Sequence, residues 1–360
     1  MWAGATATPV SLRMRTAMAM TSPNPSDKAP KPLEATQEFF ESSSSSSADG
    51  AVLTQSFGEP AAPSAPPPNT SSEPPPRIKI STLGDFRLVA KLGEGGMGTV
   101  YKAKQISTGK LVALKVLSQQ VALKPGFAER FRREVRILGR LNHPNIVRYL
   151  AAGESHGFVY LAMELVDGGS VGTWLTKLGR FSVGDSLYIA RACAMALEYA
   201  HQEHMVHRDV KPDNLLVTKT GIVKLTDLGL AKTTDDSDVS CTRTGTGIGT
   251  PLYAPPEQAR DAKHVDARSD IYSLGGVLYH FLTGQPPFQA DHLLQMILLK
   301  EKGDYKAASQ VNSRVPPALD RILVKMLDRK LENRYQSISM FLDELDRLSW
   351  TSESISFLTG

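Results

Sequence analysis

The chain has 360 residues, with 41 basic and 37 acidic side chains, so it is long enough for one large domain or two ordinary ones. A formal net charge of +4 is too small to indicate a nucleic-acid-binding surface. The two cysteines, Cys193 and Cys241, lie far apart in the sequence, which excludes a disulfide framework and is typical of a reducing compartment. No apolar run has the length of a membrane span, and we expect a cytoplasmic protein without one.

Residues 1–82 are rich in serine, proline, alanine and threonine, and they include the low-complexity runs SSSSSS (42–47) and PSAPPP (63–68). Such a composition buries too little apolar surface to offset the entropy that is lost on ordering. We therefore predict a disordered N-terminal tail, which would act as a tether or as a recruiting segment.

Short apolar runs with the alternation of β-strands follow this tail. The runs FRLVAKLG, GTVYKAK, KLVALKVL and GFVYLAMELV predict strands, and residues 127–141 have helical spacing. After Gly168 helical spacing dominates, and Ser182 can cap one of the helices. These elements predict an α+β fold with three parts: a small β-rich lobe (83–166), a larger mainly helical lobe (167–347) and a short C-terminal tail (348–360).

The stretch GEGGMG (93–98) fits the pattern G-x-G-x-x-G, which by itself is a weak signal. A dinucleotide-binding turn of this pattern must open a helix, whereas Thr99, Val100 and Tyr101 favour a strand. A glycine loop inside a hairpin can instead fold over phosphates, because the absent side chains let backbone N–H groups approach. A flexible turn without a ligand is the alternative.

Lys115 shares one face of its predicted strand with apolar residues, and Glu134 falls on the inward stripe of the next helix. A charge in either position needs a partner, because burying an unpaired charge is costly. We therefore predict an ion pair between Lys115 and Glu134. The alternative is that both side chains reach solvent separately.

The stretch VHRDVKPDNLLV (206–217) places Asp209, Lys211 and Asn214 within six positions. A carboxylate can accept a hydroxyl proton, a neighbouring lysine can neutralise a phosphoryl group, and an amide oxygen can bind Mg²⁺. Downstream, VKLTDLG (223–229) predicts a strand that ends at Asp227, a second oxygen ligand for a metal. The pattern indicates phosphoryl transfer.

In this order and spacing, the motifs resemble those of the eukaryotic-type serine/threonine protein kinases over about residues 86–345. The stretch GTPLYAPPEQ is most similar to bacterial members of that family. The resemblance implies the two-lobe protein kinase fold and transfer of the γ-phosphate of ATP to serine or threonine hydroxyls of protein substrates, with Mg²⁺ or Mn²⁺. It also implies self-association for autophosphorylation in trans.

The same resemblance implies a role for each matching residue. Asp209 would be the catalytic base, helped by Lys211, and Glu134 would hold Lys115. Asn214 and Asp227 would bind the metal. Met163 would border the adenine pocket, and the contacts with ATP would come from both lobes: Gly93, Gly95, Gly98, Val100, Ala113, Lys115, Glu164, Val166 and Leu216.

Two further assignments concern the helical lobe. By resemblance, Asp270 would brace the catalytic loop, and Arg334 would pair with Glu257. Thr250 would help to place the substrate, and Thr242 and Thr244 match autophosphorylated threonines of an activation loop. The sequence departs from the family at two positions: Leu228 replaces the usual phenylalanine, and Pro255 adds a second proline before Glu257.

Other functions remain open on the sequence alone. A pseudokinase would keep the fold, but such proteins usually lose the equivalents of Lys115, Asp209 or Asp227, which this chain retains. A phosphotransferase acting on small molecules is disfavoured by residues 242–257, which resemble a peptide-docking platform. A metal site formed by His201, His204 and His207 is also disfavoured, because the spacing differs from the i, i+4 spacing of helical histidine ligands.

Overall fold

The computed structural model describes residues 81–123, 126–228, 252–260, 265–348 and 350–358. By its internal contacts the chain divides into the units Met1–Pro74 and Pro75–Gly360, and every described residue belongs to the second unit. The predicted disordered tail therefore lies almost entirely outside the described residues.

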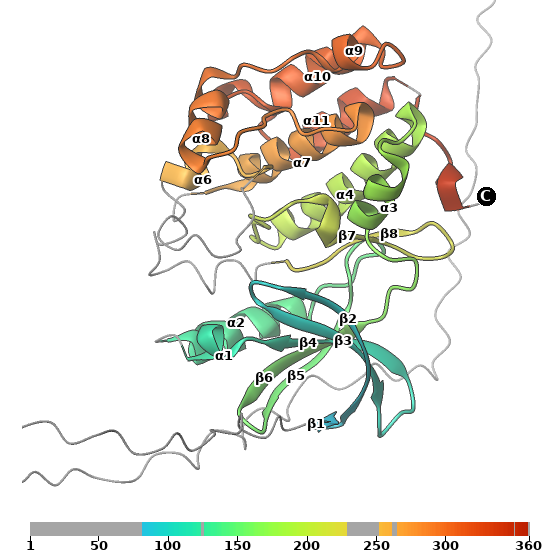
Figure 1. The fold of residues 1–360 in the computed structure, drawn as a ribbon, viewed down its shortest axis with the longest axis vertical. Helices are drawn as coiled ribbons and strands as arrows, with labels where there is room; N and C mark the ends of the chain where they lie inside the picture. Colours follow the sequence, from blue (N-terminus) through green and yellow to red (C-terminus); the bar gives the residue numbers. More distant parts are fainter. Residues whose placement is uncertain (1–80, 124–125, 229–251, 261–264, 349, 359–360) are drawn as a thin grey trace, which may run out of the picture. The chain divides into compact units, whose positions relative to one another are not determined.

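The N-terminal lobe is built on a six-stranded antiparallel sheet in the order β1-β2-β3-β4-β6-β5 (Figure 1). Its strands are short and are joined mostly by tight turns, as the alternating apolar runs predict. Their bounds are β1 (Thr82–Leu83), β2 (Phe86–Gly95), β3 (Gly98–Gln105), β4 (Leu111–Leu117), β5 (Tyr149–Ser155) and β6 (Phe158–Glu164).

Strand β4 separates two apolar clusters, because successive side chains of a strand point to opposite faces. Val112 and Leu114 pack into a small cluster on one face, whereas Ala113 and Leu117 join the main core on the other. That core also receives α2 (Phe127–Leu138), which follows the one-turn helix α1 (Gln119–Ala122). The predicted alternation in this strand is confirmed.

The C-terminal lobe is mainly helical, and its long helices α4 and α7 are packed together (Figure 1). Ser182 caps α4 as predicted, because its hydroxyl accepts a hydrogen bond from the Asp185 N–H at 3.0 Å. The helices are α3 (Val171–Leu178), α4 (Val183–Gln202), α6 (Pro256–Arg260), α7 (Ala267–Thr283), α8 (Leu293–Lys302), α9 (Ala308–Val311), α10 (Pro317–Met326) and α11 (Ile338–Asp346), with single turns at η1 (Pro212–Asn214), η4 (Leu331–Asn333) and η5 (Ser356–Leu358).

The two lobes meet at a hairpin of β7 (Leu215–Val217) and β8 (Val223–Leu225). Ile146 forms a parallel bridge with Leu225, and the Val147 N–H donates to the Leu225 carbonyl at 2.9 Å. One apolar cluster continues from the N-terminal lobe into the helices of the C-terminal lobe. The lobe junction is therefore a packed interface beside β7 and β8, the strands that adjoin the predicted site residues Asn214 and Asp227. None of the helices in the described part of the chain is long and apolar enough to cross a membrane.

Candidate active site

The glycine-rich stretch forms the turn between β2 and β3, where Gly95 lies opposite Gly98. Gly98 has a φ of +146°, and a Cβ atom there would lie 2.1 Å from the Val116 carbonyl oxygen. Glycine is needed at this position for both its backbone angle and its space. Because the loop joins two strands, it does not have the strand-to-helix geometry of a dinucleotide-binding turn.

The loop between α4 and β7 brings Asp209, Lys211 and Asn214 together. Lys211 Nζ lies 2.6 Å from Asp209 Oδ2. The amide nitrogen of Asn214 donates to the Asp209 backbone oxygen at 2.7 Å and to its Oδ2 at 3.1 Å. The carboxylate is thus held between a cation and an amide, and its orientation is fixed within its own loop.

Buried side chains hold the backbone of the loop that carries Asp209. Asp270 of α7 accepts the backbone N–H groups of His207 and Arg208, each at 2.8 Å, and its Oδ2 lies 2.8 Å from His201 Nε2. The ring of His207 spans the loop, because Nδ1 lies 3.2 Å from the Asp209 nitrogen and Nε2 lies 2.8 Å from the Thr226 carbonyl. The contacts predicted for Asp270 are confirmed.

Both ring nitrogens of His207 are engaged in these hydrogen bonds, and Nε2, which faces a carbonyl, carries the proton. Within the described residues, no cluster of three or more His, Cys, Asp or Glu side chains has the arrangement of a metal site. His201 is instead hydrogen-bonded to Asp270, and His207 to the Thr226 carbonyl.

The partner of Lys115 differs from the one that the sequence predicts. Its ammonium lies 2.8 Å from Asp227 Oδ2, and Lys115 is buried whereas the carboxylate is partly exposed. Among the ion pairs between described residues, none joins Lys115 to Glu134, although Glu134 does make an interaction of its own. Asp227 lies two residues after β8, and from there its carboxylate reaches Lys115 of the N-terminal lobe.

Apolar residues of both lobes meet beside this ion pair. Ala113 and Met163 are buried in the main core, and Val100, Val166 and Leu216 pack against it. These side chains come from β3, β4, β6, the segment after β6, and β7. The apolar residues predicted to contact adenine therefore belong to, or pack against, one and the same apolar core.

Two contacts at the lobe junction were not predicted from the sequence. Lys224 of β8 reaches Glu164 Oε1 at 2.8 Å, and the Arg148 N–H donates to the same oxygen, also at 2.8 Å. The sequence signal that could have predicted the Lys224 contact is strand alternation, because Val223 and Leu225 are buried and Lys224 must point to the other side.

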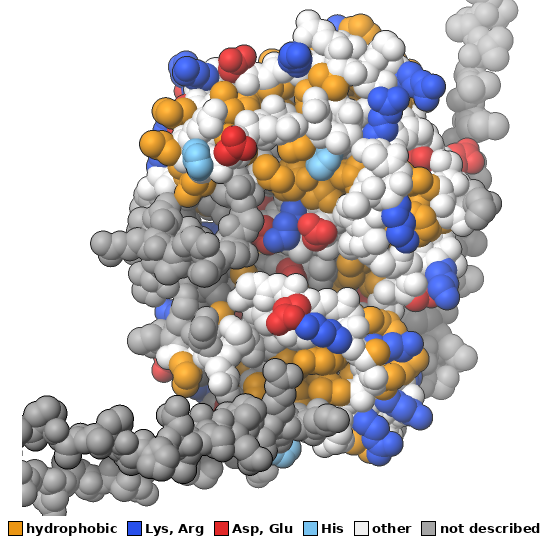
Figure 2. All heavy atoms as spheres, in the orientation of Figure 1, with side chains coloured by type: hydrophobic (Ala, Val, Ile, Leu, Met, Phe, Trp, Pro, Cys, Tyr) orange, Lys and Arg blue, Asp and Glu red, His pale blue; other side chains and the backbone are white. Residues whose placement is uncertain are grey.

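Figure 2 shows that basic and acidic side chains are interspersed over the described part of the face in view.

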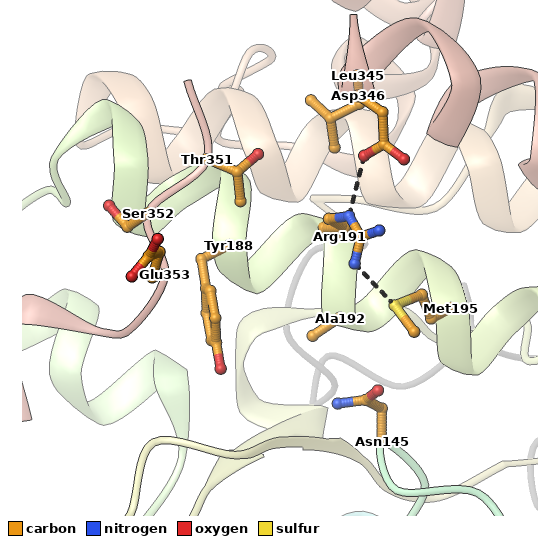
Figure 3. Close-up of a pocket in the computed structure, with 10 residues that line it drawn as sticks. All are labelled: Asn145, Tyr188, Arg191, Ala192, Met195, Leu345, Asp346, Thr351, Ser352 and Glu353. Atoms are coloured by element: carbon orange, nitrogen blue, oxygen red, sulfur yellow. Dashed lines mark hydrogen bonds and ion pairs between the residues drawn. The ribbon is translucent and has the colours of Figure 1, made fainter. Parts of the chain in front are cut away.

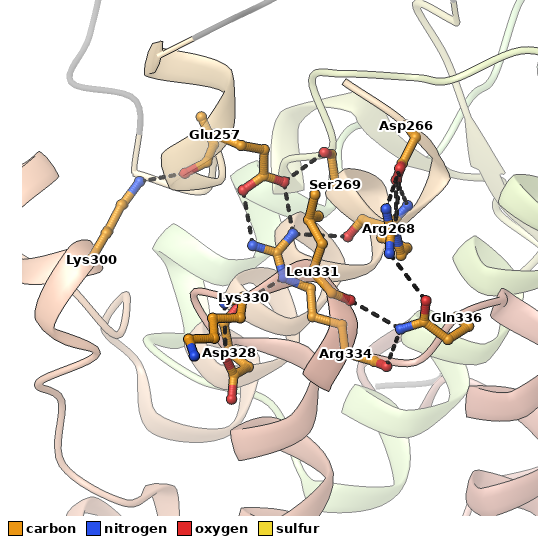
Figure 4. A network of polar contacts seen from close by, with 11 residues as sticks. Glu257, Asp266, Arg268, Ser269, Lys300, Asp328, Lys330, Leu331, Arg334 and Gln336 are labelled. Carbon is orange, nitrogen blue, oxygen red and sulfur yellow. Dashed lines mark hydrogen bonds and ion pairs between the residues drawn. The ribbon is translucent and has the colours of Figure 1, made fainter. Parts of the chain in front are cut away.

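The predicted pairing of Arg334 with Glu257 is confirmed, with distances of 2.7 and 2.9 Å between the guanidinium and the two carboxylate oxygens (Figure 4). Ser269 also donates to Glu257 at 2.6 Å. Burial by itself would raise the pKa of Glu257, but the hydrogen bonds and charge of Arg334 and the Ser269 hydroxyl lower it overall. Helix α6 begins at Pro256, so Pro255 precedes the helix without displacing Glu257 from its partner.

The remaining predicted residues fall outside the described part of the chain. Thr242, Thr244 and Thr250 lie there, as does Cys241, whereas Cys193 is buried in α4. Burial raises the pKa of the Cys193 thiol, which is typical of a packing residue rather than a nucleophile.

The fold and these contacts define a class. The family model described as "protein kinase domain" matches residues 86–344, and the chain belongs to this family. It is 38% identical over 261 residues to the serine/threonine-protein kinase PknB of Mycobacterium tuberculosis, covering 71% of this chain and 42% of that protein. It is equally 38% identical over 258 residues to a probable serine/threonine-protein kinase of Streptomyces coelicolor, covering 71% of this chain and 38% of the relative.

A solved structure of the Mycobacterium tuberculosis PknI kinase domain is similar to the chain, with a TM-score of 0.59 and 28% identity. The match covers 74% of this chain and 97% of that domain. The two-lobe protein kinase fold and the likeness to bacterial family members are therefore confirmed. The chain spans less than half the length of the curated relatives that it matches.

Proposed function

We propose that the chain is a serine/threonine protein kinase that transfers the γ-phosphate of ATP to hydroxyl groups of protein substrates. The observation that carries the proposal is the grouping of Asp209, Lys211 and Asn214 in one loop, next to the segment that bears Asp227. The Thr226 N–H donates to the Asn214 carbonyl at 2.9 Å, and Asp227, the next residue, is held by Lys115 from the other lobe. The names of the bacterial relatives give independent support.

In this proposal Asp209 orients the substrate hydroxyl and accepts its proton as the oxygen attacks the γ-phosphorus. The bond between that phosphorus and the β,γ-bridging oxygen breaks, and ADP leaves. Lys211, which already lies against Asp209, neutralises charge on the transferring group. Lys115 would bind the α- and β-phosphates, which requires it to leave or share Asp227. The glycine loop at Gly93, Gly95 and Gly98 would cover the phosphates.

The oxygen atoms of Asn214 and Asp227 suit Mg²⁺ or Mn²⁺, which prefer hard oxygen ligands. Asn214 donates through its amide nitrogen to Asp209, and this orients its amide oxygen away from that carboxylate. A cation bound there would neutralise the charge of the phosphates. One carboxylate and one amide fit a metal that takes its other ligands from phosphate and water.

Adenine would bind the backbone carbonyl of Glu164 and the backbone of Val166, since the Glu164 N–H already donates to the Arg148 carbonyl at 2.9 Å. Val100, Ala113 and Leu216 would lie above and below the ring. The buried thioether of Met163 would limit the depth of the pocket. A need for ATP, together with only two cysteines that lie far apart in the sequence, supports a cytoplasmic location.

The test is transfer of labelled phosphate from ATP to a generic serine- and threonine-containing protein, followed by phosphoamino acid analysis. We expect phosphoserine or phosphothreonine that depends on added Mg²⁺ or Mn²⁺, and we expect Lys115→Met and Asp227→Asn to abolish it. Nucleotide binding without any transfer would instead indicate a pseudokinase. Transfer to a small alcohol or sugar but to no protein would indicate a small-molecule phosphotransferase.

We further propose that Thr242 or Thr244 is autophosphorylated in trans and that Thr250 helps to place the substrate. The support is that Thr242 and Thr244 precede Thr250 by eight and six residues, a spacing similar to that of the autophosphorylated threonines of bacterial family members. Arg208, next to Asp209, is a cation that can bind such a phosphate. Mass spectrometry of a catalytically inactive Asp209→Asn chain, mixed with active chain and ATP, tests this. Absence of phosphate from both threonines of the inactive chain contradicts it.

A further inference from the structure

The segment 350–358, which follows the family match, is docked onto the helical lobe beside α3 and α4 (Figure 1). Ile355 is buried, and Ser356 binds the carboxylate of Asp185 through both its backbone N–H (2.8 Å) and its hydroxyl (2.6 Å). Asp185 is itself buried in the first turn of α4 and also accepts the Ser182 hydroxyl at 2.8 Å. Several donors therefore compensate the buried charge of Asp185, and Ser356 supplies two of them.

Phe357 continues this contact towards α3. Its ring stacks on Phe181 with a centroid distance of 4.9 Å and an interplanar angle of 15°, and lies 5.1 Å from the ring of Trp174. Phe181 is also packed edge-on against Phe281 of α7. The Phe357 ring of the C-terminal segment thus contacts the Trp174 indole of α3, and Phe357 itself stacks on Phe181, which is buried in the core.

Trp174 connects α3 to the segment that joins the two lobes. Its indole N–H donates to the Gly168 carbonyl at 2.9 Å, two residues after Val166. A Cβ atom at Gly168 would lie 2.3 Å from the Val217 carbonyl oxygen, so the joining segment already lies directly against β7. A shift of α3 cannot be absorbed on that side without moving backbone atoms.

The inner side of α3 is equally close to the catalytic loop. A Cβ atom at Gly172 would lie 2.4 Å from Asp213 Oδ1, and Asp213 precedes Asn214 directly. Ser170, the cap of α3, forms a bridge with Leu216 of β7. Helix α3 therefore lies against Asp213 of the catalytic loop on its inner side and against Phe357 on its outer side, and the Trp174 indole joins it to the lobe-joining segment.

We propose that the C-terminal segment is a positioning element for the nucleotide, in which Phe357 and Trp174 hold the backbone of residues 166–168 where it can bind adenine. This inference rests on the proposed function of the same site. It predicts that the contacts of the segment affect ATP binding more than the catalytic step, because Trp174 binds the backbone of Gly168, whereas the Asp209 carboxylate is held by Lys211 and Asn214 of its own loop.

Different parts of the segment should contribute unequally. Thr351, Ser352 and Glu353 line one side of a cavity of about 530 Å³, whose other residues include Tyr188 and Arg191 of α4 (Figure 3). The segment is thus separated from α4 by open space at Glu353, whereas Ile355 is buried. Glu353→Ala is therefore a control in the same segment that removes an exposed side chain.

The experiment compares Phe357→Ala, Trp174→Phe and Glu353→Ala with the wild-type chain. Trp174→Phe keeps an aromatic ring for Phe357 but removes the N–H that binds Gly168. We measure KM for ATP, KM for the protein substrate, kcat and the melting temperature, and the Kd of a fluorescent ADP analogue without any substrate.

We expect Phe357→Ala and Trp174→Phe to raise the KM for ATP and the Kd of the ADP analogue about three- to tenfold, the range for one lost hydrogen bond or a comparable contact. Kcat should change less than about twofold, and Glu353→Ala should match wild type. A lower melting temperature with unchanged nucleotide affinity in both variants would overturn the inference. If the wild type transfers no phosphate but binds the analogue, the proposed function fails, while the affinities still decide this inference.

Discussion

Replacing Arg334 with methionine should destabilise the C-terminal lobe strongly. Its guanidinium is almost completely buried and donates to both oxygens of Glu257, to the Asp328 carbonyl at 2.7 Å and to the Arg268 carbonyl at 3.2 Å. It also lies 4.7 Å from the ring centre of Tyr272. Methionine keeps much of the apolar stem but leaves the Glu257 carboxylate and two carbonyls without these donors.

Removing one partner of a buried ion pair costs about 3–5 kcal/mol, because the other charge remains buried. For a domain of this size, such a loss lowers the melting temperature by on the order of 10 °C. The matched control is Arg191→Met, since Arg191 forms a solvent-exposed pair with Asp346 at 3.0 Å. Exposed pairs contribute about 0–1 kcal/mol.

The assay is urea-induced unfolding of both variants and wild type, followed by far-UV circular dichroism and tryptophan fluorescence. The double variant Arg334→Met/Glu257→Gln should recover part of the loss, because it removes the uncompensated charge. Equal destabilisation by Arg334→Met and Arg191→Met would refute this reasoning, as would a double variant that loses the sum of both single changes.

Two other substitutions test separate parts of the structure. In the proposed mechanism Glu134 would hold Lys115 when that lysine leaves or shares Asp227 to bind the phosphates. Glu134→Ala should therefore lower kcat about 10- to 100-fold, while the Kd for ATP changes less than about threefold; an unchanged kcat would remove Glu134 from the mechanism. Lys300 is buried against the Ala254 carbonyl at 2.7 Å, and burial lowers its pKa to about 7. Between the folded-state pKa of about 7 and the unfolded-state pKa of 10.5, the Lys300 amine is protonated only in the unfolded chain. The free energy of unfolding should therefore rise with pH in this range, by up to about 1.4 kcal/mol per pH unit. Lys300→Met should remove this increase with pH, whereas Lys302→Met, which changes an exposed lysine, should keep it. Thermal unfolding of both variants and wild type at pH 7, 8 and 9 measures the difference.

Local patterns predicted much of the fold because the signals lie within a few residues of one another. The two faces of β4 follow from alternation alone, and the Ser182 cap of α4 follows from a hydroxyl placed before an apolar helical stripe. The bracing of the catalytic loop by Asp270 spans more than sixty positions, and it was predicted only through the family resemblance.

The contacts that the sequence did not predict depend on how distant segments approach one another. Lys115 has two acidic candidates, and only the relative placement of β8 and α2 decides that Asp227 is its partner in this structure. The docking of residues 355–357 was also missed, because a short segment with one isoleucine and one phenylalanine has no periodicity that indicates burial. Its partners, Asp185 and Phe181, lie more than 170 positions earlier.

The most direct test of the proposed function is the rate of phosphate transfer to protein by Asp209→Asn at saturating ATP and Mg²⁺. Asparagine keeps the shape of the side chain and can still face Lys211 and Asn214, but it cannot accept the proton of the substrate hydroxyl. We predict a loss of about 10²- to 10⁴-fold in kcat with nearly unchanged affinity for ATP, and wild-type activity in the exposed control Asp304→Asn. Wild-type turnover by Asp209→Asn would contradict the assignment of this site.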